Sequence, residues 1–86
     1  MHTVQLLEEA IRLAQQAGYC IRQEWLGGRG GGGCEIRGRK WLFVDLALEP
    51  GEQLGQVLDA LRRDPAVAGL SAPEPLHGWL EPRKIA

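Results

Sequence analysis

The sequence has little of what usually identifies a chemistry. Its 86 residues include only two cysteines, two histidines and one tyrosine, and its formal net charge at pH 7 is −1. Two cysteines do not make a disulfide scaffold, and a charge near zero gives no global reason to bind nucleic acid or acidic polymers. No secretory leader and no apolar run of membrane-spanning length is present. We therefore expect a cytoplasmic protein with reduced thiols that binds neither membranes nor nucleic acid.

Metal ligands and catalytic groupings are also missing from the sequence. Cys20, Cys34, His2 and His77 show neither the C-x₂-C nor the H-x₃-H spacing of a zinc site. Neither histidine is placed as a base for a cysteine nucleophile. We therefore expect no metal and no cofactor, and we favour a protein that is not an enzyme.

Glycine, by contrast, is abundant in one place. Six of the seven residues at positions 27–33 are glycine, Arg29 is the exception, and Cys34 follows directly. A phosphate-binding loop would require Lys-Ser or Lys-Thr and a helix after it, whereas this run leads into a predicted strand. Two interpretations stay open: a mobile connection between strands, or a ligand or partner site in which loop amides and Arg29 contact an anion.

The pattern of apolar residues predicts one α+β domain over residues 1–86. Helical spacing marks residues 3–18 and 49–64, and alternation marks a strand at 19–26. Residues 34–48 read as a β-hairpin whose apolar second arm lies at the centre of a mostly antiparallel sheet. The expected order is α-β-β-β-α, followed by a short edge strand around residues 67–70 and a helical turn within an irregular tail at 71–86.

Asp45 is the most informative single residue, because it interrupts the apolar run "WLFVDLAL". A carboxylate on a central strand must be paired or solvated. It is either a ligand-binding or catalytic group, or a structural one held by backbone N–H groups or by Arg22 or Arg39, and we favour the structural interpretation. We likewise expect Cys34 to be a small packed hydrophobe rather than a reactive thiol.

Aromatic residues allow two interpretations. Tyr19, Trp25, Trp41 and Phe43 could form a stacking platform for nucleic acid if they faced solvent. Aromatics at strand spacing are more often part of a core, and tryptophans also anchor protein interfaces. Trp25 and Trp79 are therefore the residues at which we expect a protein partner.

The span from Leu26 to Arg63, "LGGRGGGGCEIRGRKWLFVDLALEPGEQLGQVLDALRR", resembles a group of small bacterial proteins. These carry a glycine-rich loop, a cysteine and an "LFVDL" strand before a helix, and the resemblance implies a compact domain without a particular chemistry. The same hairpin and helix are similar, more weakly, to those of ImmA/IrrE-type metallopeptidase domains. That family's zinc helix needs H-E-x-x-H, and the helix here, "EQLGQVLDALRR", has no histidine.

Taken together, these features favour a non-enzymatic module that binds a protein partner or forms a homodimer. We expect its contact surface to be the glycine-rich loop and the basic hairpin, and the residues concerned are Gly28, Arg29, Gly30, Gly31, Gly32, Arg37, Arg39 and Lys40. The alternative is a small-ligand or anion binder, or a minor enzyme, that uses Asp45, Cys34 and the loop amides.

Overall fold

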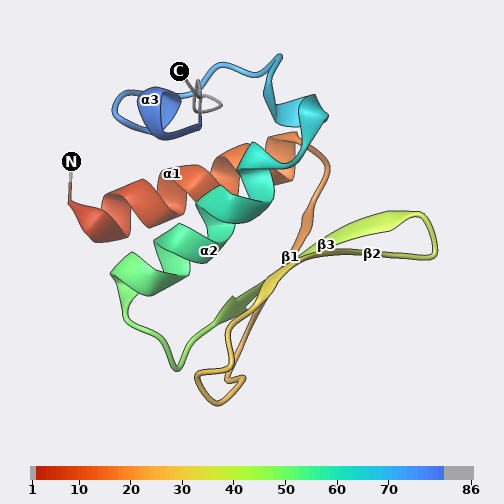
Figure 1. Cartoon of the computed structure of the whole chain (residues 1–86), viewed down its shortest axis with the longest axis vertical. Coiled ribbons are helices and arrows are strands. Elements are labelled where there is room, and N and C mark those ends of the chain that lie inside the picture. The colour runs from red at the N-terminus through yellow and green to blue at the C-terminus, as the bar shows by residue number, and fades with distance from the viewer. Residues whose placement is uncertain (1, 81–86) are drawn as a thin grey trace, which may run out of the picture.

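The structure is a computed structural model that describes residues 2–80, and it has one layer of helices and one layer of sheet (Figure 1). The elements in chain order are α1 (Thr3–Gln16), β1 (Cys20–Glu24), β2 (Gly32–Ile36), β3 (Arg39–Asp45), α2 (Pro50–Arg62), the short 3-10 helix η1 (Pro65–Val67) and α3 (Leu76–Leu80). The predicted α+β class and the order α-β-β-β-α are confirmed.

Both long helices form where the apolar periodicity predicts them. Pro50 opens α2, where its missing N–H costs no hydrogen bond. Gly18 follows α1 with φ +99°, a left-handed conformation that ends the helix without strain on a side chain. The buried faces of the helices meet the sheet in one core cluster: Leu6, Leu7, Ala10, Leu13, Ala14, Leu42, Val44, Leu54, Val57, Leu58, Leu61, Val67 and Leu76.

The three strands are ordered β1-β3-β2, so the apolar strand β3 is central, as predicted. The sheet is mixed, because β1 pairs with β3 in parallel while β2 pairs with β3 antiparallel. The sequence predicted a mostly antiparallel sheet, and a loop that joins two strands commonly leads to a direct pairing of those strands. Instead these strands lie on opposite sides of β3, and the loop must cross the end of β3 to join them.

Only one face of the sheet is covered by the described helices. Leu42 and Val44 are 0% and 1% exposed and belong to the core. Because side chains alternate along a strand, Trp41 and Phe43 point to the opposite face, and neither contacts the core cluster. Figure 1 shows α1 and α2 on the same side of the sheet. We call the uncovered side the open face; its residues are Cys20, Arg22, Glu24, Gly32, Cys34, Ile36, Arg39, Trp41 and Phe43.

The segment after α2 differs in part from the prediction. Residues 65–67 form η1, followed by turns, so the expected edge strand around residues 67–70 is wrong. Asp64 accepts a hydrogen bond from Ala66 N at 2.9 Å and so stabilises the turn instead. The expected helical turn is α3, in which Leu76 is fully buried and Trp79 is 42% exposed. The last six residues of the expected tail lie outside the described residues.

Candidate functional site

The glycine-rich loop wraps around the carboxylate of Asp45. Asp45 is the last residue of β3, and the loop passes this end of the strand on its way from β1 to β2. The Asp45 side chain is completely buried. Oδ1 accepts hydrogen bonds from Leu26 N at 3.0 Å and Ala47 N at 2.9 Å, and Oδ2 accepts one from Gly30 N at 3.0 Å. The charge is therefore held by backbone amides on both sides of β3.

These hydrogen bonds also control the ionisation of Asp45. Removal from water raises the pKa of the carboxyl, but the N–H groups of Leu26, Ala47, Gly30 and Gly28 lower it by more. The net pKa lies below the ordinary aspartate value, so Asp45 is ionised at neutral pH. A low pKa is the property of a structural anion and is opposite to what a general acid requires.

A second side chain fixes the loop from the helix layer. Gln56 of α2 accepts a hydrogen bond from Gly31 N at 2.9 Å, and a Cβ on Gly30 would lie within contact of the same side chain amide. A Cβ on Gly31 would lie 1.7 Å from the carbonyl oxygen of Phe43. The loop therefore needs glycine at both positions because it passes against β3 and α2.

This geometry bears on the sequence-based interpretations of the loop and of Asp45. The amides of Leu26, Gly30 and Gly31 are bound to side chains of the chain itself, so they are not available to an external anion. The Asp45 carboxylate accepts hydrogen bonds from backbone N–H groups, which is one of the two kinds of partner expected under the structural interpretation. The two arginines proposed as its partners do not fill that role: Arg22 contacts Glu24 at 3.2 Å, and Arg39 is exposed.

The structure does not bring Cys34 and Asp45 together. Cys34 lies opposite Trp41, four residues before Asp45 on β3, which corresponds to about 13 Å along a strand. Cys34 is exposed, so the prediction that it is packed in the core is wrong. The alternative site, built from Asp45, Cys34 and the loop amides, is therefore not assembled.

The two cysteines lie on opposite sides of the central strand. Cys20 and Cys34 are both register partners of Trp41. Two strand spacings separate them by about 10 Å, beyond the reach of a disulfide. Both are free thiols.

The open face carries aromatic and apolar side chains together with basic ones. The rings of Trp41 and Phe43 lie side by side, with centroids 6.4 Å apart and an interplanar angle of 26°. Both side chains are half-buried, while Ile36 is 49% exposed. Arg37 and Gly38 form the tight turn of the hairpin with φ +52° and +78°. This combination is typical of a surface that contacts another macromolecule.

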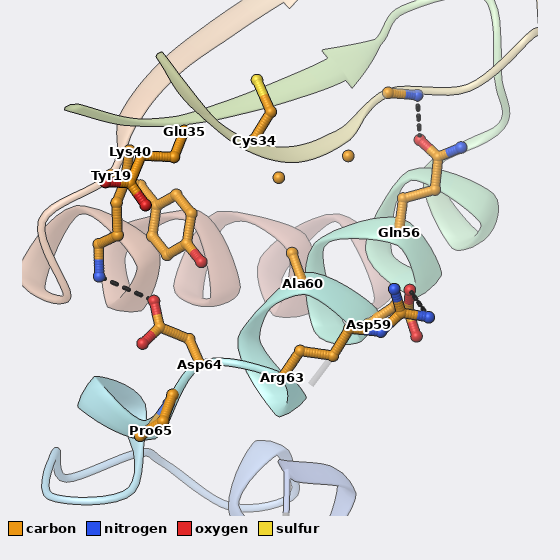
Figure 2. Close-up of a pocket in the computed structure, with 13 residues that line it drawn as sticks. Tyr19, Cys34, Glu35, Lys40, Gln56, Asp59, Ala60, Arg63, Asp64 and Pro65 are labelled. Carbon is orange, nitrogen blue, oxygen red and sulfur yellow. Dashed lines mark hydrogen bonds and ion pairs between the residues drawn. The ribbon is translucent and has the colours of Figure 1, made fainter. Parts of the chain in front are cut away.

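A groove of about 560 Å³ lies on the other side of β2, between that strand and α2 (Figure 2). Its floor includes Tyr19, whose ring lies 4.7 Å from Lys40 Nζ. Lys40 Nζ donates to Asp64 Oδ2 at 2.7 Å, and this contact is the main cause of a lowered Asp64 pKa. Desolvation, followed by hydrogen bonding to Asp64 and its charge, raises the pKa of Tyr19 to about 12. The Lys40–Asp64 ion pair and the neutral Tyr19 stabilise this end of the groove.

The structure separates the predicted contact residues into two groups. The N–H groups of Gly30 and Gly31 donate to Asp45 and Gln56, whereas Gly28 and Arg29 are exposed at the surface of the loop, with the Gly28 N–H directed at Asp45. Of the basic hairpin residues, Arg37 and Arg39 are exposed but Lys40 faces the helices. No signal in the sequence identified Gln56 as the residue that holds the loop, because its partner is a backbone amide 25 positions away.

Comparison of the chain with protein-family models, with curated proteins and with solved structures finds no match. Within residues 2–80, no helix has the length and apolar character needed to cross a membrane. The same residues contain no group of three or more histidine, cysteine or acidic side chains placed to bind a metal ion. The two-layer fold with one open sheet face is therefore the basis for a functional proposal.

Proposed function

We propose that this protein is a protein-interaction module whose contact surface is the open face of its sheet, bordered by the basic turn of the hairpin. The observation that supports this is the position of Trp41 and Phe43. A stacked aromatic pair on the central strand lies on the side that no described helix covers. Aromatic residues surrounded by polar and charged groups are the usual energetic centre of a protein interface.

The charges around the aromatic pair define the chemistry of a partner. Arg37 and Arg39 lie at the exposed hairpin end, while Glu24, the acid among the open-face residues, lies at the other end of the sheet and contacts Arg22. A partner would therefore present an apolar centre to Trp41 and acidic groups to the hairpin turn. In this proposal the glycine-rich loop is held in place by Asp45 and is not itself a binding site. Of the contact surface predicted from the sequence, only the hairpin is therefore kept.

The proposal is tested by capturing partners from extracts of the source cells with three immobilised baits. These are the wild type, Trp41→Thr, which keeps a strand-forming residue on the open face, and Val4→Thr. Val4 is 51% exposed on α1 and serves as the matched control for removing a surface hydrophobe. Loss of a tryptophan anchor costs about 2 kcal/mol or more, which corresponds to roughly 30-fold weaker binding.

We expect a captured protein to be retained by the wild type and by Val4→Thr, and to be lost with Trp41→Thr. Circular dichroism checks that all three baits are folded. A set of captured proteins that does not depend on Trp41 would contradict the proposal. Binding of single-stranded oligonucleotides that weakens steeply with salt would replace it by the nucleic-acid interpretation.

A further inference from the structure

The outer edge of β2 is a second surface that the proposed function does not use. With β3 in the centre, β2 pairs on one side only. Its sequence, GGCEI, contains no proline, and its register with β3 is continuous, without a bulge. Proteins usually protect exposed edge strands with features such as prolines and bulges, because an unprotected edge can pair with another chain. The edge therefore has the properties of a pairing surface.

The hairpin turn determines which backbone groups of β2 point outward. Arg37 and Gly38 both have positive φ, as in a two-residue type I′ turn, so Ile36 and Arg39 form a hydrogen-bonded pair. Hydrogen-bonded and non-hydrogen-bonded pairs alternate in an antiparallel ladder. The N–H and C=O groups of Gly33 and Glu35 therefore point away from β3. No turn, loop or cap hydrogen bond within residues 2–80 uses them.

From this pattern we infer that β2 pairs edge to edge with β2 of a second copy of the chain, antiparallel, with the two-fold axis at Cys34. This dimer is a specific form of the proposed function, since the second copy is itself a protein partner. Gly33 of each copy would lie opposite Glu35 of the other, which forms all the hydrogen bonds that the free groups allow. A register shifted to place Glu35 opposite Glu35 would oppose like charges directly.

On the open face, this register fits an exposed side chain to an empty position. Ile36 of each copy would lie beside Gly32 of the other. Ile36 is 49% exposed in the single chain, and no atom lies within 4 Å of a Cβ built on Gly32. Gly32 is the register partner of Phe43, so Ile36 of the second copy would pack beside that ring. The dimer would join the two open faces into one surface across six strands.

On the helix side, the groove between β2 and α2 accepts the other side chain of the pair. Glu35 of the second copy would lie beside Gly33, which has no side chain of its own, and would enter the groove next to Ala60 and Tyr19, whose side chains lie 3.3 Å and 3.6 Å from a Cβ built on Gly33. Arg63 lines this groove from α2 (Figure 2). Its contact with Asp59, at 3.3 Å, is highly exposed and therefore weak, which leaves other guanidinium donors for the incoming carboxylate. The groove's own carboxylates are those of Glu35, Asp59 and Asp64. The two aspartates are paired with Arg63 and Lys40, and the contact of the incoming Glu35 with Arg63 is repeated by symmetry.

Mass measurement in solution is the first test. Light scattering coupled to size exclusion should give twice the 9.5 kDa mass of the chain for the wild type. Glu35→Pro removes an outward N–H without disturbing the hydrogen bonds to β3 and should halve the mass. Glu35→Thr keeps that N–H but loses the carboxylate that enters the groove, so it should still form the dimer, with a higher dissociation constant than the wild type. Circular dichroism verifies that the variants fold.

Cross-linking tests the register. In the inferred pairing, the two Cys34 residues face each other as a non-hydrogen-bonded pair with Cα atoms about 4.5 Å apart, within disulfide range. In a Cys20→Ser background, diamide, a two-electron thiol oxidant, should link Cys34 to Cys34 and release two protons to the reduced diamide. The control Cys20→Ser/Cys34→Ser/Ile36→Cys places the thiols about 14 Å apart and should remain un-linked.

The results separate this inference from the proposed function. A wild type that is monomeric at high concentration, a dimer unaffected by Glu35→Pro, or equal cross-linking through position 36 would each overturn the β2 dimer. A monomer that captures a partner through Trp41 would overturn the dimer and leave the proposed function standing. A dimer that cross-links through Cys34, while capture is independent of Trp41, would support the dimer and contradict the partner surface on the open face.

Discussion

Replacing Gly31 by alanine tests whether the glycine-rich loop is a fitted part of the fold or a loose connection. A Cβ at this position would lie 1.7 Å from the carbonyl oxygen and 2.4 Å from the carbonyl carbon of Phe43. Both atoms belong to the backbone of the central strand, so neither can turn away as a side chain could. The loop itself must move, and the hydrogen bond from Gly31 N to Gln56 is lost with it.

The expected loss of stability follows from these two effects. Forcing extra atoms into a packed site costs about 1–3 kcal/mol, and a hydrogen bond of this kind contributes about 1 kcal/mol. The free energy of unfolding should therefore fall by about 2–4 kcal/mol. For a domain of this size, 1 kcal/mol corresponds to roughly 4–8 °C, so the Tm should fall by about 10–30 °C.

Urea and thermal unfolding followed by circular dichroism measure the effect, with Gly55→Ala as the matched control. Gly55 is exposed in the middle of α2, and a Cβ there would meet nothing within 4 Å. Alanine favours a helix over glycine by about 0.5–1 kcal/mol, so the control should be slightly more stable than the wild type. A Gly31→Ala variant within about 0.5 kcal/mol of the wild type would refute the fitted loop.

Three further predictions concern the core and the groove. Leu42→Ala, at a fully buried position of β3, should lower the free energy of unfolding by about 2–5 kcal/mol in urea titrations, and a smaller loss would mean that the core closes around the cavity. Because Lys40 lowers the pKa of Asp64, the unfolded state binds more protons in acid. The stability that Asp64 contributes should therefore be constant above about pH 5 and fall as the pH drops through the lowered pKa. Asp64→Asn should flatten this dependence of stability on pH, and an unchanged slope would contradict the prediction. Tyr19 is the one tyrosine in the sequence, so absorbance at alkaline pH should show tyrosinate formation near pH 12. The stability that the neutral form of Tyr19 supplies should be lost between about pH 10 and 12. A titration midpoint at the ordinary value of 10 would show that the hydroxyl is solvated.

Local patterns were sufficient to predict most of the secondary structure. The apolar spacing of α1 and α2, the proline at the start of α2 and the continuous apolar run of β3 each depend on near neighbours along the chain. The position of β3 at the centre of the sheet followed for the same reason, since a strand that is apolar on both faces needs neighbours. The segment at residues 67–70 was assigned as a strand because its composition did not reveal the turn that Asp64 stabilises through Ala66.

Strand pairing was not predictable from the same signals. β1 and β2 are adjacent in sequence and joined by a loop, which favours a direct antiparallel pair. They flank β3 instead, because burial of the β3 face under both helices and the anchoring of the loop end at Asp45 depend on contacts between distant residues. The separation of Cys34 from Asp45, and the exposure of Cys34, follow from this pairing.

The sequence by itself determined the two long helices and the central strand. It also determined that Asp45 needs partners, since a lone charge in an apolar strand must be paired or solvated. Only the tertiary structure decided what those partners are. The loop N–H groups that could otherwise bind a phosphate are directed at Asp45. A buried carboxylate is stabilised more by fixed backbone N–H donors than by exposed arginines. Gly30 and Gly31 allow the loop to pass close to Phe43 of β3 and Gln56 of α2, and this constraint exists only once β3 and α2 are in place.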